Sequence, residues 1–184
     1  MSCARRGSYT ITGSYENVQL LFSGKKVGIL DPRGAFGDAD ALREVELQLK
    51  KLIKCPGTEV LTEDQLSATG WLPAIYSENL EKSHLQYFTE KTDLDYLIHI
   101  VTGPGRLASQ TGLSAGFGAD REAHAHLIVY DLHNKTEAKT ITVNGTLNQD
   151  VDKKWYETEY SEPDLGRRAI RKGLELLIKY SDCS

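Results

Sequence analysis

The fold is decided by the stretch Asp95-Tyr-Leu-Ile-His-Ile-Val101, which is apolar at almost every position. A strand with one face in water alternates apolar and polar residues, whereas a strand that is covered on both faces is apolar along its whole length. The stretch therefore predicts a strand in the middle of a sheet, with other elements packed on both of its faces.

A β-α-β crossover is predicted ahead of this strand. Residues 25–30, Lys-Lys-Val-Gly-Ile-Leu, indicate a short strand, and Asp38 can cap a helix whose apolar residues recur at helical spacing as far as Ile53. Cys55-Pro-Gly57 ends that helix, because proline cannot continue it and glycine turns freely. Residues 58–61 then predict the second strand of the crossover.

Three further elements are predicted in the first half of the chain. Residues 14–22 are expected to form a hairpin with the 25–30 strand around a turn at Ser23-Gly24. Thr62-Glu-Asp-Gln65 has the capping-box pattern that begins a short helix. Ser77 is expected to start a longer helix that ends near Lys91, with a loop at residues 70–76 before it.

The second half of the chain predicts an antiparallel hairpin. Residues 121–132 and 137–147 are two long strand candidates, and the turn between them contains Asn134, which suits a backbone position with positive φ. Before the hairpin, residues 103–118 contain five glycines, which is typical of a loop.

A terminal helix completes the predicted fold. Pro163 opens it, and its apolar residues keep helical spacing as far as Ile178, so we expect it to pack on the sheet. The fold class is α+β, an α/β sandwich whose mixed sheet contains the crossover and the hairpin. We expect residues 1–13 to be a flexible N-terminal tether and residues 14–184 to form a single α/β domain.

Composition and charge narrow the range of partners. The 184 residues include 22 Lys and Arg against 26 Asp and Glu, which gives a formal net charge of −4. Nucleic acid is not an expected partner, because binding its phosphates requires a positive field. The most apolar stretch, residues 96–101, is far shorter than the roughly 20 apolar residues that cross a bilayer, so no spanning segment is expected.

The cysteines leave several interpretations open. Cys3, Cys55 and Cys183 have no Cys-x-x-Cys spacing, so neither a zinc knuckle nor a thioredoxin-type pair is predicted. Cys55 and Cys183 form a disulfide in an oxidising compartment or stay thiols in a reduced cytosol.

Residues 1–6 lack the apolar core of a secretory signal, which favours the cytoplasm. Alternatively, Cys3 is the lipid acceptor of a lipoprotein whose signal has been removed, or an ordinary exposed cysteine.

One pair of side chains could bind a metal ion. His124 and His126 are two residues apart on a predicted strand, so both imidazoles point to one face, where Glu122 or Tyr130 could supply a third ligand. The simpler interpretation is that this is the solvent face of the strand, opposite the apolar residues that alternate with it.

Catalysis has little support in the sequence. There is no phosphate-binding loop signature and no Gly-x-Ser-x-Gly motif, and Asp93 and Asp95 resemble a carboxylate pair only by their spacing. We therefore predict no enzyme activity, no cofactor and no catalytic residue. Large aromatic residues in polar loops are instead the candidates for protein contacts, namely Trp71, Tyr76, Trp155 and Tyr156.

The order of the predicted elements resembles the small α/β domain shared by the curli-secretion lipoprotein family (CsgG), the peptidoglycan-synthase activator LpoB and the N-terminal domain of TolB. The resemblance covers about residues 25–180 and rests on short motifs. The matching segments are residues 26–30 with Pro32, residues 42–53, residues 57–66, residues 94–100 with Gly103, residues 126–132 with Lys135 and Thr136, and the helix from Asp164.

This resemblance implies a non-enzymatic envelope lipoprotein or periplasmic accessory domain that binds protein partners in an envelope assembly or secretion complex. It would be anchored through Cys3 on the periplasmic face of the envelope, with the outer membrane and a homo-oligomer as further expectations. Two alternatives stay open. The first is a small-ligand or metal-binding domain in which the 103–118 loop closes over His124 and His126. The second is a cytoplasmic structural domain.

Overall fold

The computed structural model describes residues 8–12, 19–52, 54–68, 79–104, 121–147 and 162–183. Within these residues, seven strands form one mixed sheet in the order β1-β7-β6-β5-β2-β4, and β3 pairs with β5 beside this path. The strands are β1 (Ser8–Thr12), β2 (Lys26–Ile29), β3 (Arg33–Gly34), β4 (Glu59–Leu61), β5 (Tyr96–Pro104), β6 (Arg121–Asp131) and β7 (Thr136–Leu147).

The sheet has a parallel half and an antiparallel half, as the sequence predicts. β2 runs parallel to both β4 and β5, and helix α1 (Ala39–Leu52) makes the crossover from β2 to β4. β5, β6, β7 and β1 follow one another antiparallel, and β6 and β7 are the predicted hairpin. β5 joins the two halves and is buried from Leu97 to Gly103, so its predicted central position is confirmed.

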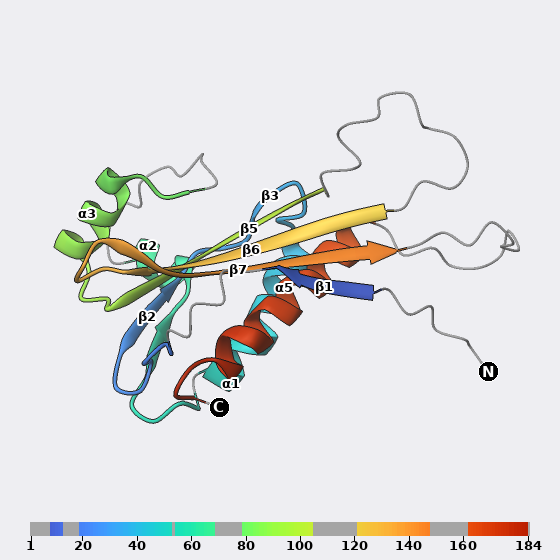
Figure 1. Cartoon of the computed structure of the whole chain (residues 1–184). Helices are drawn as coiled ribbons and strands as arrows, with labels where there is room; N and C mark the ends of the chain where they lie inside the picture. The colour runs from blue at the N-terminus through green and yellow to red at the C-terminus, as the bar shows by residue number, and fades with distance from the viewer. Residues whose placement is uncertain are drawn as a thin grey trace, which may run out of the picture.

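Four described helices cover the sheet (Figure 1). α1 packs beside α5 (Glu162–Lys179), and their buried residues join those of the sheet in one core. α2 (Glu63–Ala68) and α3 (Lys82–Lys91) lie over one end of the opposite face. Alternation along β6 shows the two faces clearly, because Leu127 belongs to the first core and Ile128 to the second. The predicted packing of the terminal helix on the sheet is confirmed.

The predicted helix caps are present at α1 and α2. The Asp38 carboxylate accepts a hydrogen bond from the backbone N–H of Ala41 (2.8 Å), which satisfies a donor that the first turn would otherwise leave unpaired. The Gln65 side chain accepts a hydrogen bond from the backbone N–H of Thr62 (2.9 Å), which is half of the capping box. No described helix is long and apolar enough to cross a membrane.

The predicted opening hairpin is wrong in its described part. β2 has β4 on one edge and β5 on the other, so both of its edges are occupied and no third strand can pair with it. Residues 19–22 instead run beside the C-terminus, where Leu20 forms a parallel bridge with Ser181. Residues 13–18 lie outside the described part of the chain.

The predicted N-terminal tether also needs correction, because residues 8–12 form the strand β1. Ser8-Tyr-Thr-Ile-Thr12 pairs antiparallel with β7 in a regular register from Thr146 to Thr142. The alternation of hydroxyl and apolar residues is typical of a strand at the edge of a sheet, although the segment is only five residues long.

Two local predictions differ from the structure by a few residues. α3 begins at Lys82 rather than at Ser77, and Leu80 is buried ahead of the helix, where its N–H donates to the Tyr130 hydroxyl (3.0 Å). In the β6–β7 turn the residue with positive φ is Lys135 (54°) rather than Asn134. Asn134 instead donates hydrogen bonds to the Asp131 carboxylate from its backbone and side chain.

Candidate functional site

The residues predicted to contact partners, namely Trp71, Tyr76, Trp155 and Tyr156, lie outside the described part of the chain. The predicted lipid acceptor Cys3 and most of the 103–118 loop lie outside it as well. The residues predicted to bind a metal are described, and they direct attention to the sheet face that α1 and α5 leave uncovered.

Three histidines gather on this face around Val101 of β5. His126 of β6 is directly opposite Val101 in the register, and His124 is opposite Gly103. His99 precedes Val101 by two residues in the same strand and so shares its face. We call His99, His124 and His126 the histidine patch.

The outer part of the histidine patch consists of His124 and His126. Their ring centroids are 4.6 Å apart, and a hydrogen bond of 2.8 Å joins His126 Nδ1 to Thr142 Oγ1 on β7. Both histidines are partly exposed, whereas the alternate residues Ala123 and Ala125 are buried. The predicted assignment of the two faces is confirmed from Glu122 to Leu127, whereas farther along the histidine face Ile128 and Tyr130 are buried.

Among the residues that the structure describes, neither Glu122 nor Tyr130 completes a metal site with this pair. Among the described residues, Cys55, Asp182 and Cys183 are the group of three ligand side chains whose ligand atoms lie within 4.8 Å of one another, so Glu122 does not complete a site with the histidines. Tyr130 is buried, and its hydroxyl accepts the hydrogen bond from Leu80. For a metal ion, this arrangement therefore offers two imidazole ligands, those of His124 and His126.

The ring of His124 depends on the absence of a side chain at Gly103. A Cβ atom at this glycine would lie 2.8 Å from Cε1 of His124 and 3.0 Å from Nε2, so the imidazole packs directly on the β5 backbone. The sequence gives no sign of this contact, because the two residues are 21 positions apart.

The variant Gly103→Ala is expected to be less stable than the wild type by about 1–2 kcal/mol, because the added methyl group displaces the imidazole. Chemical denaturation at neutral pH measures this difference. The double variant Gly103→Ala/His124→Ala is expected to recover most of the loss relative to His124→Ala alone. Equal losses in the two backgrounds would contradict the contact.

The inner part of the histidine patch is His99, which the sequence analysis did not single out as a site. Its side chain has an exposed fraction of 0%, and neither ring nitrogen has a hydrogen-bond partner among the described residues. Burial is the main reason why the pKa of His99 is lowered to about 4, and the electrostatic effects of Arg33 and His84 contribute to the same shift. His99 is therefore neutral at pH 7. The sign in the sequence that could have pointed to His99 is an ionisable residue inside a strand that is apolar on both faces.

Arg33 lies on the same face, beside Val101 in the register of β3 with β5. Its guanidinium forms an ion pair with Glu63, whose other carboxylate oxygen accepts the backbone N–H of Asp31 (2.7 Å). These contacts fix the link between β2 and β3 to the start of α2.

The acidic pair Asp93 and Asp95 is an ion-pair cluster. Asp95 accepts hydrogen bonds from the Lys25 ammonium (3.0 Å) and from the backbone N–H of Lys26 (2.9 Å), and Asp93 pairs with the Lys26 ammonium. Partial burial opposes ionisation of Asp95, but its hydrogen bonds outweigh this effect and lower its pKa. The carboxylates are thus engaged in holding β2 beside the start of β5.

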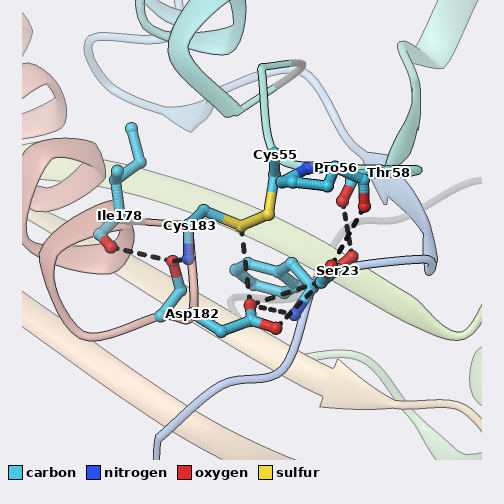
Figure 2. The surroundings of a disulfide bond; sticks show 9 residues. Ser23, Cys55, Pro56, Thr58, Ile178, Asp182 and Cys183 are labelled. Atoms are coloured by element: carbon cyan, nitrogen blue, oxygen red, sulfur yellow. Dashed lines mark hydrogen bonds between the residues drawn. A yellow bond between two sulfur atoms is a disulfide. The ribbon is translucent and has the colours of Figure 1, made fainter.

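A disulfide joins Cys55 to Cys183. The sequence had left open whether these two cysteines form a disulfide or stay thiols. Cys55 follows α1 and Cys183 follows α5, and the two Cα atoms are 4.9 Å apart. Figure 2 shows the surrounding hydrogen bonds, in which the Asp182 carboxylate accepts the backbone N–H of Ser23 while the Ser23 hydroxyl donates to the carbonyl of Pro56 (3.0 Å).

Comparisons with known proteins give similar structures but no family. No protein-family model matches the sequence, and no curated protein matches it. Among solved structures, a PelC dodecamer from Paraburkholderia phytofirmans has 12% identity and a TM-score of 0.46, with 94% of this chain and 97% of that chain covered.

Two further similar structures come from other bacteria. A lipoprotein from Neisseria meningitidis has 11% identity and a TM-score of 0.43, with 67% of this chain and 83% of that chain covered. A homologue of a neuraminyllactose-binding hemagglutinin from Helicobacter pylori has 10% identity and a TM-score of 0.44, with coverages of 88% and 84%. TM-scores below 0.5 are too low to assign a function, and membership of the CsgG, LpoB and TolB group stays a prediction.

Proposed function

We propose that this chain is a non-enzymatic accessory domain of the bacterial cell envelope that binds protein partners in an envelope assembly or secretion complex. The observation that carries the proposal is the disulfide between Cys55 and Cys183. Structural disulfides persist in the periplasm and outside the cell, whereas the cytosol of most bacteria keeps thiols reduced. The disulfide thus favours the periplasm over the cytoplasmic alternative.

The surroundings of the disulfide support a structural role for it. Cys55 is buried, and Asp182 next to Cys183 accepts the backbone N–H of Phe22 (2.7 Å). Three segments that are far apart in the sequence therefore meet at the sulfur atoms. A bond in such a place stabilises the fold in an oxidising compartment and has no evident use in a reducing one.

A lipid anchor at Cys3 would hold the domain close to a membrane. β1 begins at Ser8, so five residue steps separate the proposed anchor from the sheet. A fully extended chain of five residues spans about 18 Å, which is less than the thickness of a bilayer. The proposed contact residues, Trp71, Tyr76, Trp155 and Tyr156, would then bind partners near the membrane surface.

Counting free thiols in the native product tests this proposal. Cells that express the full-length gene in its own host are lysed in a thiol-alkylating reagent, and the mass of the product is measured without reduction. A lipidated Cys3 and a Cys55–Cys183 disulfide leave no cysteine to alkylate, because the chain contains three cysteines. The expected product is unalkylated, carries an acyl mass and fractionates with membranes.

Two other outcomes would overturn parts of the proposal. A product with one alkylated cysteine and no acyl mass would still support an oxidising compartment, but it would overturn the lipid anchor at Cys3. Three alkylated cysteines in a product of the soluble fraction would overturn the envelope proposal. The variant Cys3→Ala serves as the matched control, because it removes the acyl group and leaves the disulfide intact.

A second candidate function is binding of a small ligand or a metal ion, which the 4.6 Å separation of the His124 and His126 rings favours. Two imidazoles give weak binding, so titration with Zn²⁺ or Cu²⁺ is expected to raise the melting temperature by a few degrees at most. His124→Ala/His126→Ala should abolish that shift. An identical response from both proteins would exclude this site.

A further inference from the structure

Three side chains at the disulfide have the chemistry of zinc ligands. The sulfur atoms of Cys55 and Cys183 and a carboxylate oxygen of Asp182 lie within 4.8 Å of one another. Thiolate sulfur and carboxylate oxygen both bind Zn²⁺, and three protein ligands leave the fourth tetrahedral position to water. While the disulfide is intact, its sulfur atoms are bonded to each other, so this ligand set exists only in the reduced chain.

The spacing of the ligand atoms fits a tetrahedral zinc ion. Zn–S and Zn–O bonds of ordinary length place a sulfur and an oxygen about 3.6 Å apart and two sulfurs about 3.8 Å apart. Cys183 Sγ is 3.6 Å from Asp182 Oδ1, and Figure 2 shows the carboxylate beside the sulfur atoms. The Cα atoms of Cys55 and Cys183 are 4.9 Å apart, so both side chains reach a common ion after reduction.

Hydrogen bonds that do not involve sulfur hold the carboxylate in position. Asp182 accepts the backbone N–H of Phe22 (2.7 Å) and the backbone N–H of Ser23 (3.2 Å). The backbone N–H of Asp182 in turn donates to the carbonyl of Leu20 (3.0 Å). Hydrogen bonds of this kind orient a metal ligand. Asp182 and Cys183 are also partly exposed, which gives a reductant and an ion a path to the site.

We propose that Cys55, Asp182 and Cys183 bind Zn²⁺ when the disulfide is reduced. A dithiol reductant gives two electrons and two protons to the disulfide and itself becomes a disulfide, which leaves two thiols on this chain. Zn²⁺ then displaces both thiol protons and bonds to the two sulfurs, and Asp182 supplies an oxygen. The ion thus joins the end of α1 to the end of α5 in place of the sulfur–sulfur bond. The inference goes beyond the proposed function, because it concerns the reduced chain and requires neither the lipid anchor nor a partner.

Metal titrations of the purified chain in a Cys3→Ala background test this inference. The chain is reduced with a phosphine, which competes little for the metal, and is titrated with Co²⁺ and then with Zn²⁺ under argon. We expect a single Co²⁺ per chain with thiolate-to-cobalt charge-transfer absorption and the visible bands of a tetrahedral ion, both of which Zn²⁺ removes. The oxidised chain should show no charge transfer. Imidazole ligands give no such absorption, so binding at His124 and His126 is distinguished from binding at this site.

Two variants identify the ligands. Cys55→Ser should abolish the charge-transfer absorption of the tetrahedral ion, and Asp182→Asn should weaken Zn²⁺ binding by about tenfold or more. Asparagine keeps an oxygen that can accept the N–H groups of Phe22 and Ser23, so the variant removes mainly the charge. Asp64→Asn, at an exposed position of α2, is the matched control and should bind like the parent.

The outcomes that would overturn the inference are specific. They are a folded, reduced chain that binds no metal, a charge-transfer absorption that persists in Cys55→Ser, and an affinity for Zn²⁺ that is unchanged in Asp182→Asn. A reduced chain that is unfolded, as judged by circular dichroism, and that Zn²⁺ does not refold would overturn it as well. None of these results would affect the proposed envelope function, which depends on the state of the cysteines in the native product.

Discussion

The double variant Cys55→Ala/Cys183→Ala is expected to unfold with a free energy about 4 kcal/mol lower than that of the wild type. The disulfide spans a sequence separation of 128 residues, and closing so long a loop removes much of the conformational freedom of the unfolded chain. The chain-entropy estimate for this length is about 5 kcal/mol, and measured losses in small secreted domains are about 2–5 kcal/mol. For a domain of ordinary stability this loss is large.

Urea unfolding at pH 7 with and without dithiothreitol measures the effect. The reductant is expected to lower the stability of the wild type to that of the double variant and to leave the double variant unchanged. Cys3→Ala is the control and should unfold like the wild type in both conditions. A double variant as stable as the oxidised wild type would show that the disulfide does not constrain the unfolded chain.

His99 is expected to make the protein sensitive to acid. Its pKa is about 4 in the folded protein, against 6.5 for an ordinary histidine, because burial disfavours the charged imidazole. Between these values the unfolded chain binds a proton that the folded chain does not, so stability falls as the pH falls from 6.5 to 4. The full difference corresponds to about 3 kcal/mol.

The variant His99→Leu isolates this contribution. Leucine resembles histidine in size, and no described hydrogen bond is lost, because both ring nitrogens lack partners. At pH 7 we expect His99→Leu to be at least as stable as the wild type, and on acidification to pH 4 we expect it to lose about 3 kcal/mol less. Gln86→Leu, a substitution of a non-ionisable residue at an exposed position of α3, should keep the wild-type profile. Parallel profiles for the wild type and His99→Leu would contradict the assignment.

The sequence predicted the elements whose local pattern agrees with their place in the fold. α1 has both an Asp38 cap and an apolar face, and β5 is apolar on both of its sides, so local and global preferences coincide there. The β6–β7 hairpin was predicted for the same reason. The first strand of the crossover was also predicted, but its pairing with residues 14–22 was not, because strand partners depend on which edges are free.

The features that the sequence did not predict are contacts between distant residues. The Cys55–Cys183 disulfide and the packing of His124 on Gly103 join positions that no local pattern relates. The sequence analysis did not predict β1 as a strand, because an alternation of apolar and hydroxyl residues over only five positions cannot be distinguished from a flexible N-terminal segment. His99 has no hydrogen-bond motif that would mark it, and only its burial in the folded sheet makes it unusual.

The disulfide also determines whether cleavage of one peptide bond separates the domain into two pieces. Cys55 and Cys183 close a covalent ring that contains β4, β5, β6 and β7 together with α2, α3 and α5. A protease that cleaves one peptide bond inside this ring leaves two pieces that are still linked through the sulfur atoms. Cleavage N-terminal to Cys55, in contrast, releases a fragment that is held by noncovalent contacts alone, namely β-sheet pairing, core packing and the hydrogen bonds of Phe22 and Ser23. The ring thus makes most of the domain tolerant of single nicks and leaves its N-terminal part as the region where one cut separates the chain.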